Sequence, residues 1–206
     1  MNQSMKDWLK LSAAQHNHLC PKQVLGVRMG MFAGTLLQIP LPQSDKRLYA
    51  IVETDGCTLD GISAVTGCTP GHRTLRVEDY GKVAATFIDS VSRLAFRIVP
   101  HPEIRKFAHD YAPAGSSKWE AYLIGYQNMP DELLLAFRPV VLSVPIEKLV
   151  SRPGLKAICS RCGEEVINGR EAIAGGRPVC KPCSGESYYE PAFVDSESDL
   201  SLCHRP

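Results

Sequence analysis

The chain has 206 residues, of which 44% are hydrophobic, and a formal net charge of +1. One main domain with a small appendage is the expected organisation for this length. The balanced charge excludes an overall field that attracts nucleic acid or an acidic membrane surface, and no apolar run is long enough to span a bilayer. The first twelve residues lack the apolar core of a signal peptide. We therefore expect a cytoplasmic protein whose eight cysteines are metal ligands or free thiols.

A short amphipathic helix is expected over residues 4–14, followed by a dense group of metal-binding side chains. His16, His18 and Cys20 lie directly before Pro21. Imidazole nitrogen and thiolate sulfur are the donors that Zn²⁺ prefers. If this segment is extended, all three side chains point to one face. The alternative is a helix that starts at Pro21 and is merely flanked by the histidines.

The next helix is expected over residues 22–37, and glycines recur along it. Gly26, Gly30 and Gly34 are spaced four residues apart. Each glycine costs about 1 kcal/mol in a helix interior, so the spacing predicts close packing of this face against a neighbouring element. The charges and the short length of the segment argue against a membrane helix.

Polar chemistry gathers after a short apolar run at residues 48–52, which predicts a buried strand. Glu53, Asp55 and Cys57 follow it, and residues 58–66 are expected to be helical. A helix N-terminus lowers the pKa of a thiol through the helix dipole. Cys57 is therefore a further candidate metal ligand beside the His/Cys segment.

Three strands are expected over residues 73–77, 82–88 and 93–99, with connections short enough for hairpins. This pattern predicts an antiparallel meander. The helices and the strand expected after it lie at 101–111, at 116–127, from 130 onwards and at 137–145. Helices before and after a run of strands predict that residues 1–150 form one α+β domain with an antiparallel-rich sheet.

A break at residues 151–154 precedes a smaller unit over residues 155–185, which carries the most specific motif of the chain. Two C-x2-C pairs are separated by seventeen residues and consist of Cys159, Cys162, Cys180 and Cys183. Four thiolates at this spacing predict a closed tetrahedral Zn²⁺ site in a zinc-ribbon or treble-clef-like fold. So small a unit cannot support itself on apolar burial, and the metal supplies folding energy. Residues 186–206 are expected to form a polar, acidic tail.

These motifs together resemble the formylmethanofuran dehydrogenase E-subunit (FmdE) family. The resemblance rests on four motifs in order: His16-x-His18-x-Cys20-Pro21, Glu53-Thr54-Asp55-x-Cys57, Thr66-Gly67-Cys68-Thr69 and Asp79-Tyr80-Gly81-Lys82. Many members add a C-terminal double C-x2-C domain. The family pattern has glycine between the histidines and after the proline, where this chain has Asn17 and Lys22.

The resemblance implies an α+β domain, a zinc-ribbon-like appendage and homodimers. It also implies a transition metal, which we expect to be a second Zn²⁺, near the two histidines and Cys57, with Cys20 as a further ligand. The family name reflects association with a molybdenum or tungsten enzyme, and it does not establish an activity.

Three functions therefore compete. The first is a metal-binding accessory protein, linked to a molybdenum or tungsten formylmethanofuran dehydrogenase or to metal handling. The second is a metalloenzyme of unknown substrate, in which Asp55 or Glu53 is the general base and Lys82 an electrostatic helper. The third is a zinc-dependent regulator or adaptor that binds protein or nucleic acid through its four-cysteine unit.

Overall fold

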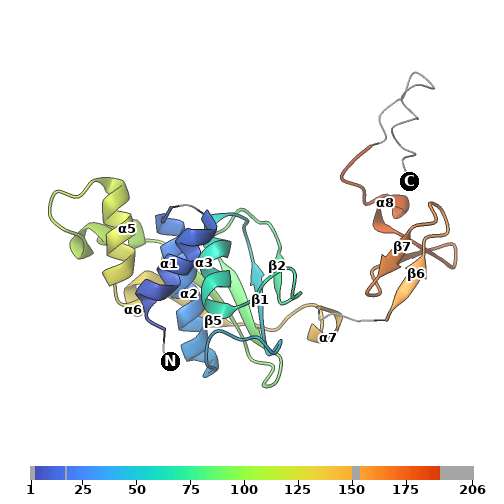
Figure 1. The fold of residues 1–206 in the computed structure, drawn as a ribbon, viewed down its shortest axis with the longest axis horizontal. Coiled ribbons are helices and arrows are strands. Elements are labelled where there is room, and N and C mark those ends of the chain that lie inside the picture. Colours follow the sequence, from blue (N-terminus) through green and yellow to red (C-terminus); the bar gives the residue numbers. More distant parts are fainter. Residues whose placement is uncertain (1–2, 17, 150–153, 191–206) are drawn as a thin grey trace. The chain divides into compact units, whose positions relative to one another are not determined.

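The computed structural model describes residues 3–16, 18–149 and 154–190. The chain divides into two compact units, Met1–Val150 and Ser151–Pro206 (Figure 1). The helices of the first unit are α1 (Met5–His16), α2 (Pro21–Leu37), α3 (Cys57–Thr66), α4 (Ile104–Phe107), the 3-10 helix η1 (Ala108–Tyr111), α5 (Lys118–Asn128), α6 (Asp131–Leu134) and α7 (Ile146–Leu149). Its strands are β1 (Leu48–Val52), β2 (Leu75–Val77), β3 (Ala85–Asp89), β4 (Ala95–Pro100) and β5 (Leu135–Pro139).

The strands of the first unit form one five-stranded sheet in the order β2-β1-β3-β4-β5. Three of its four pairings are antiparallel, and β1 pairs with β2 in parallel. The predicted α+β class with an antiparallel-rich sheet is confirmed. The predicted meander is wrong at β2, because α3 carries the chain from β1 to a parallel neighbour, as parallel pairing requires.

The segment between β2 and β3 is not a hairpin, because it passes across the end of β1. The Glu53 carbonyl accepts hydrogen bonds from the backbone N–H groups of Tyr80 and Lys82, both at 3.0 Å, and the Glu53 N–H donates to the Ala84 carbonyl at 2.9 Å. These bonds hold the crossover to the sheet. The connection over residues 78–84 is short, so length alone does not distinguish the two topologies.

The last strand of the sheet begins earlier than the sequence predicts. Strand β5 spans Leu135–Pro139 and pairs with β4 from Pro100↔Leu135 to Phe96↔Pro139. It is an edge strand, as the proline within it predicts. The expected residues after Pro139 lie outside the ladder.

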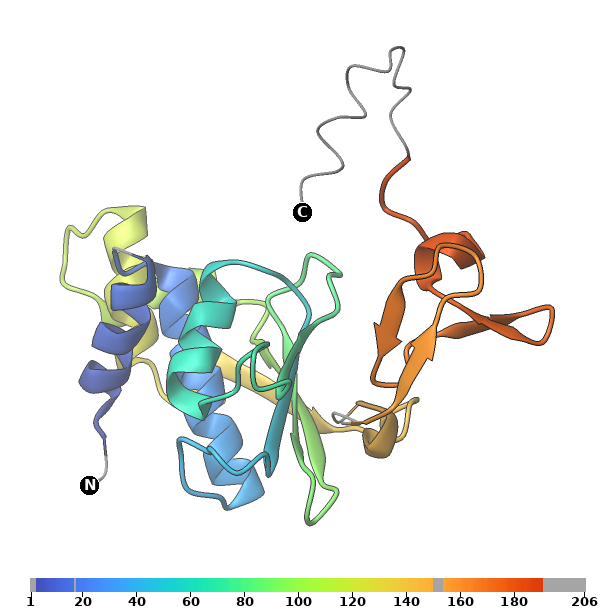
Figure 2. The ribbon, with the colours of Figure 1, turned by 45° about the vertical axis from the view of Figure 1, so that its right-hand side comes forward.

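Helix α2 is the centre of the core and contacts α1, α3, α5, β3 and β4. Figure 2 shows the helices α1–α3 on one side of the sheet. The predicted glycine packing is confirmed: a Cβ on Gly26 would lie 2.1 Å from the Thr58 carbonyl oxygen, and one on Gly61 would lie 2.3 Å from that of Gln23. The backbones of α2 and α3 therefore approach more closely than any side chain permits.

The second unit consists of two hairpins and a short helix: β6 (Lys156–Ile158) with β7 (Glu165–Ile167), β8 (Ala172–Ala174) with β9 (Arg177–Val179), and α8 (Lys181–Ser184). Its buried cluster is small and consists of Cys159, Val179 and Cys180. The predicted boundary at 151–153 and the tail from 191 lie outside the described residues. In the part of the chain that is described, no helix is both long and apolar enough to cross a membrane.

Candidate metal centres and the adjoining pocket

Four cysteines of the second unit lie close enough to hold one metal ion. The sulfur atoms of Cys159, Cys162, Cys180 and Cys183 all lie within 4.8 Å of one another, and those of Cys162 and Cys180 are 3.7 Å apart. A tetrahedral ion with bonds of about 2.3 Å to sulfur needs sulfur separations of about 3.8 Å. The cluster therefore fits such an ion without rearrangement.

The local backbone explains how one of these thiols ionises. Cys159 follows the strand β6, and the N–H groups of Cys162 and Cys180 point at its sulfur, which lowers its pKa to about 6. The Cys180 side chain, followed by burial, raises the pKa of Cys183 to about 12. A bound cation would stabilise all four thiolates together, because its charge offsets their mutual repulsion.

In the first unit, Cys20 is fixed directly before α2. The Cys20 N–H donates to the side-chain oxygen of Gln23 at 2.8 Å, and the Gln23 amide donates to the Ser12 carbonyl in α1 at 3.0 Å. Gln23 is fully buried. A single side chain therefore ties the start of α2 to α1 and sets the position of Cys20.

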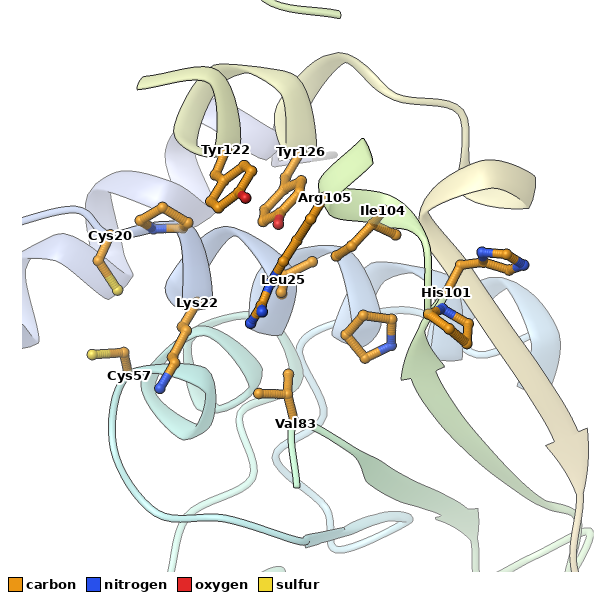
Figure 3. Close-up of a pocket in the computed structure, with 13 residues that line it drawn as sticks. Cys20, Lys22, Leu25, Cys57, Val83, His101, Ile104, Arg105, Tyr122 and Tyr126 are labelled. Atoms are coloured by element: carbon orange, nitrogen blue, oxygen red, sulfur yellow. The ribbon is translucent and has the colours of Figure 1, made fainter. Parts of the chain in front are cut away.

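Cys57 is the first residue of α3 and lies beside Cys20, although the two are far apart in the sequence. Gly56 precedes it with a φ of 79°, a conformation that favours glycine. The two thiols are within hydrogen-bonding reach, and Figure 3 shows their sulfur atoms next to each other. Burial and the Cys20 side chain raise the pKa of Cys57. The lowered pKa predicted from the helix N-terminus is therefore wrong for the protein without metal.

The histidines before Pro21 are arranged differently from the extended segment that the sequence suggested. Helix α1 continues to His16, and α2 begins at Pro21, so the segment is a tight connection between two helices. His18 is exposed. The side chain of His16 and the whole of residue 17 lie outside the described residues. The ligand roles of His16 and His18 stay predictions.

A pocket of about 590 Å³ adjoins the two thiols. It is lined by Cys20, Pro21, Lys22, Leu25, Cys57, Val83, Pro100, His101, Pro102, Ile104, Arg105, Tyr122 and Tyr126. The lining comes from the starts of α2 and α3, from the β4–α4 connection and from α5. Its volume is typical of small-molecule sites in proteins.

Helix α5 carries the aromatic wall of this pocket and is anchored by Arg28 of α2. The guanidinium donates to the carbonyls of Tyr126 at 2.8 Å and Met129 at 2.7 Å, and it pairs with Asp131 at 2.7 Å. The last carbonyls of a helix have no partner within it, so Arg28 caps α5 while joining it to α2. The rings of Tyr122 and Tyr126 stack with centroids 5.5 Å apart.

The proposed catalytic side chains lie away from the pocket lining. Asp55 and Lys82 are exposed, and neither is among the residues that line the pocket. Glu53 is buried and forms a bidentate ion pair with Arg97 at 2.5 and 2.7 Å. This pair lowers the pKa of Glu53, which makes the carboxylate a weaker base. Its evident role is to hold the end of β1 to β4.

Sequence reasoning missed the charged residues of the pocket. From the sequence, Lys22 stands out only as a departure from the family pattern, and His101 and Arg105 belong to an ordinary helix start. Tyr122 and Tyr126 fit the apolar side of a helix. Their spacing of four residues shows that they share a helix face, but nothing local indicates that this face meets Cys20.

The fold and these sites define an α+β protein with a thiol-lined pocket and a separate four-cysteine metal module. A match to the family described as "FmdE, Molybdenum formylmethanofuran dehydrogenase operon" covers residues 15–136. The chain belongs to the FmdE family.

Two known proteins add to this. An FmdE-like protein of the tungsten formylmethanofuran dehydrogenase type, from Syntrophus aciditrophicus, has a similar fold, with a TM-score of 0.58 and 22% identity over 92% of this chain and 96% of that one. A curated relative from Archaeoglobus fulgidus, named "Probable S-adenosyl-L-methionine-binding protein", is 28% identical over 84% of this chain. The chain spans 51% of that relative's length.

Proposed function

We propose that the protein is an FmdE-like metal-binding accessory protein with two metal sites. The four cysteines of the second unit would hold a structural Zn²⁺. The first unit would bind a second transition metal, expected to be Zn²⁺, through Cys20 and Cys57 together with the histidines His16 and His18. A role beside a molybdenum or tungsten formylmethanofuran dehydrogenase, or in metal handling, is the activity that we infer.

One observation carries the second site: Cys20 and Cys57 come from different helices, yet their thiols are neighbours at the edge of a pocket. Two packed thiols need no such pocket, whereas a metal that meets a small molecule does. When bound, the metal would supply Lewis acidity there.

The test is metal stoichiometry in the full chain. We expect two ions per wild-type chain and one in a folded Cys20→Ala, Cys57→Ala double variant. Cys68→Ala is the matched control, because Cys68 is buried in the same unit and its thiol donates to the Leu48 carbonyl. Anomalous scattering would locate each ion. A fully loaded wild type with a single ion at the C-terminal cysteines would contradict the second site.

A metalloenzyme is the second candidate function, and the pocket volume of about 590 Å³ favours it. Burial raises the pKa of Tyr126 to about 12, so its hydroxyl stays protonated at neutral pH and can donate to a ligand. The name of the Archaeoglobus fulgidus relative makes S-adenosyl-L-methionine a probe for this pocket. Calorimetric titration of that compound into the wild type and Arg105→Met tests it: loss of binding in the variant would support the pocket as its site.

A further inference from the structure

We propose that the pocket beside Cys20 and Cys57 binds a small organic anion. Lys22 and Arg105 would hold its acidic group, a carboxylate or a phosphate, and its apolar body would lie against the pocket wall. The inference deepens the proposed function, on which it rests for the nearby metal, and it names the class of ligand that the pocket accepts.

The charge of the lining carries the first step. Lys22 and Arg105 both line the pocket, and no carboxylate is among its lining residues in the described part of the chain. Figure 3 shows the Lys22 amine and the Arg105 guanidinium directed toward the cavity between Cys57 and Val83. Helices α2 and α3 also begin there, so the positive ends of two helix dipoles add to the field. The nearest acidic influence on the thiols is Asp60, one turn into α3.

The pairing of cations elsewhere in the same unit carries the second step. Arg28, Arg47 and Arg97 each form an ion pair with a carboxylate. Within residues 3–16 and 18–149, Lys22 and Arg105 have no such ion pair, and Arg105 interacts instead with the Tyr126 hydroxyl. A lone exposed lysine is ordinary surface chemistry. Two cations that face one cavity can bind one acidic group together.

The rest of the wall explains why the anion should be organic. Leu25, Val83 and Ile104 line the cavity together with three prolines. The hydroxyl groups of Tyr122 and Tyr126 point into it, where they can donate to the same acidic group. An inorganic ion would leave most of this apolar wall in contact with water, whereas an apolar body would cover it.

The test uses phenyl phosphate as the probe, with the full chain and isothermal calorimetry. Benzyl alcohol and benzylamine have similar apolar bodies but are neutral and cationic, and inorganic phosphate has the charge without the body. We expect phenyl phosphate to bind roughly tenfold or more tightly than each of the other three. Equal affinities for phenyl phosphate and benzylamine, or for phenyl phosphate and inorganic phosphate, would overturn the proposal.

Variants locate the binding. Lys22→Met and Arg105→Met should each weaken phenyl phosphate binding by roughly tenfold, with unchanged circular dichroism. Lys106→Met is the matched control, because Lys106 neighbours Arg105 in α4 but pairs with Glu103 and does not line the pocket. Binding that ignores both pocket variants, or that disappears only when a chelator removes metal, would overturn the proposal.

Metal analysis of the same samples separates this inference from the proposed function. Two ions per chain without phenyl phosphate binding would refute the anion pocket alone. One ion per chain, with binding that depends on Lys22 and Arg105, would refute the second metal site alone.

Discussion

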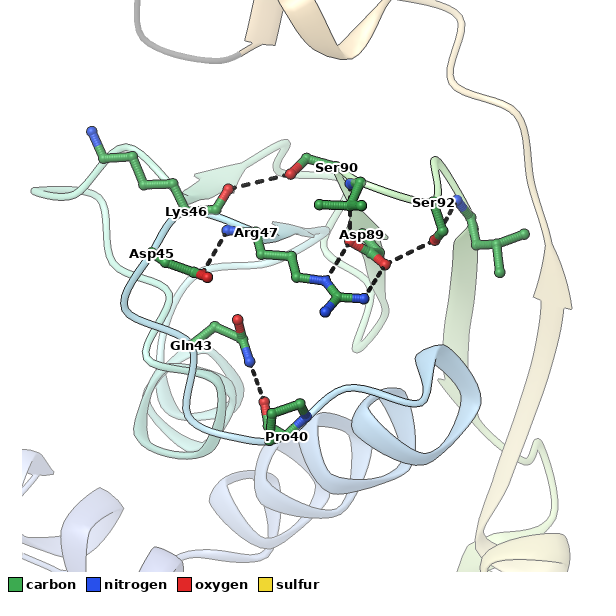
Figure 4. Close-up of polar contacts among 10 residues, drawn as sticks. Pro40, Gln43, Asp45, Lys46, Arg47, Asp89, Ser90 and Ser92 are labelled. Carbon is green, nitrogen blue, oxygen red and sulfur yellow. Dashed lines mark hydrogen bonds and ion pairs between the residues drawn. The ribbon is translucent and has the colours of Figure 1, made fainter.

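Asp89 is a fully buried carboxylate whose charge is matched by donors from two segments (Figure 4). Arg47 donates to its two oxygens at 2.9 Å each, the Val91 N–H donates at 3.0 Å, and the Ser92 hydroxyl donates at 2.8 Å. Arg47, first of all, holds the pKa of Asp89 well below its usual range. A buried charge with this many partners stabilises the fold only while it is ionised.

We predict that Asp89→Asn lowers the free energy of unfolding at neutral pH by an amount on the order of 2 kcal/mol. A lowered folded-state pKa gives stability that is present above the unfolded value and is lost as pH falls toward the folded value. Wild-type stability should therefore fall between roughly pH 5 and pH 2, and more steeply than that of the variant. Urea unfolding at several pH values measures this. Asp45→Asn, an exposed change in the same loop as Arg47, should have little effect at any pH, and parallel pH curves for wild type and Asp89→Asn would refute the prediction.

Residues whose role depends on a distant partner cannot be assigned from the sequence. Glu53 follows a buried strand and has the chemistry of a base, but Arg97 neutralises it from another strand. The residue types of Cys20 and Cys57 make both of them candidate ligands, and the fold brings them together. Arg105 joins the same pocket through tertiary packing alone, and no local pattern encodes that.

At the scale of elements, the contact between α2 and α3 was predictable, but its strictness was not. The spacing of Gly26 and Gly30 predicts one close-packed face, yet the two glycines meet different atoms. A Cβ on Gly26 would meet a backbone carbonyl, whereas one on Gly30 would lie 3.1 Å from the Val65 side chain. Backbone cannot move aside as a side chain can, so the two positions differ in tolerance.

We predict that Gly26→Ala destabilises the first unit by about 1–3 kcal/mol. Gly30→Ala is the matched control in the same helix. There the gain in helix propensity, about 1 kcal/mol, offsets the tighter contact, so its effect should be near zero. Urea unfolding followed by circular dichroism compares the two. Equal losses of stability in both variants would show that the backbone contact of Gly26 is not the limiting one.

Sheet order was the element-scale feature that the sequence left undetermined. The alternation in β3 and β4 predicts their antiparallel pairing correctly, because a short turn joins neighbours. Strand β2 has the pattern of a further member of the same meander, but it pairs with β1. Its position depends on backbone hydrogen bonds from Tyr80 and Lys82 to Glu53, which any sequence of suitable length could make.

At the scale of the whole molecule, the two units are stabilised in different ways. The first unit has a large core that includes Val24, Met29 and Phe87. The second has only three buried residues in its cluster, two of which are cysteines. The spacing of the C-x2-C pairs made the four-cysteine cluster predictable, because metal geometry constrains spacing tightly. The pocket of the first unit was not predictable, since it is assembled from several separate segments.

We predict that a Cys162→Ser, Cys183→Ser double variant loses its ordered second unit while the first unit stays folded. Without a metal, the apolar burial in the second unit is too small to offset the entropy of ordering its hairpins. Amide hydrogen exchange should show fast exchange over residues 155–185 and wild-type protection in β1, β3 and α2. Ser160→Ala, an exposed change in the same loop as Cys159 and Cys162, should leave both units protected. Loss of protection in both units together would mean that they fold as one cooperative body, and protection retained at the C-terminal hairpins would mean that the metal does not support their fold.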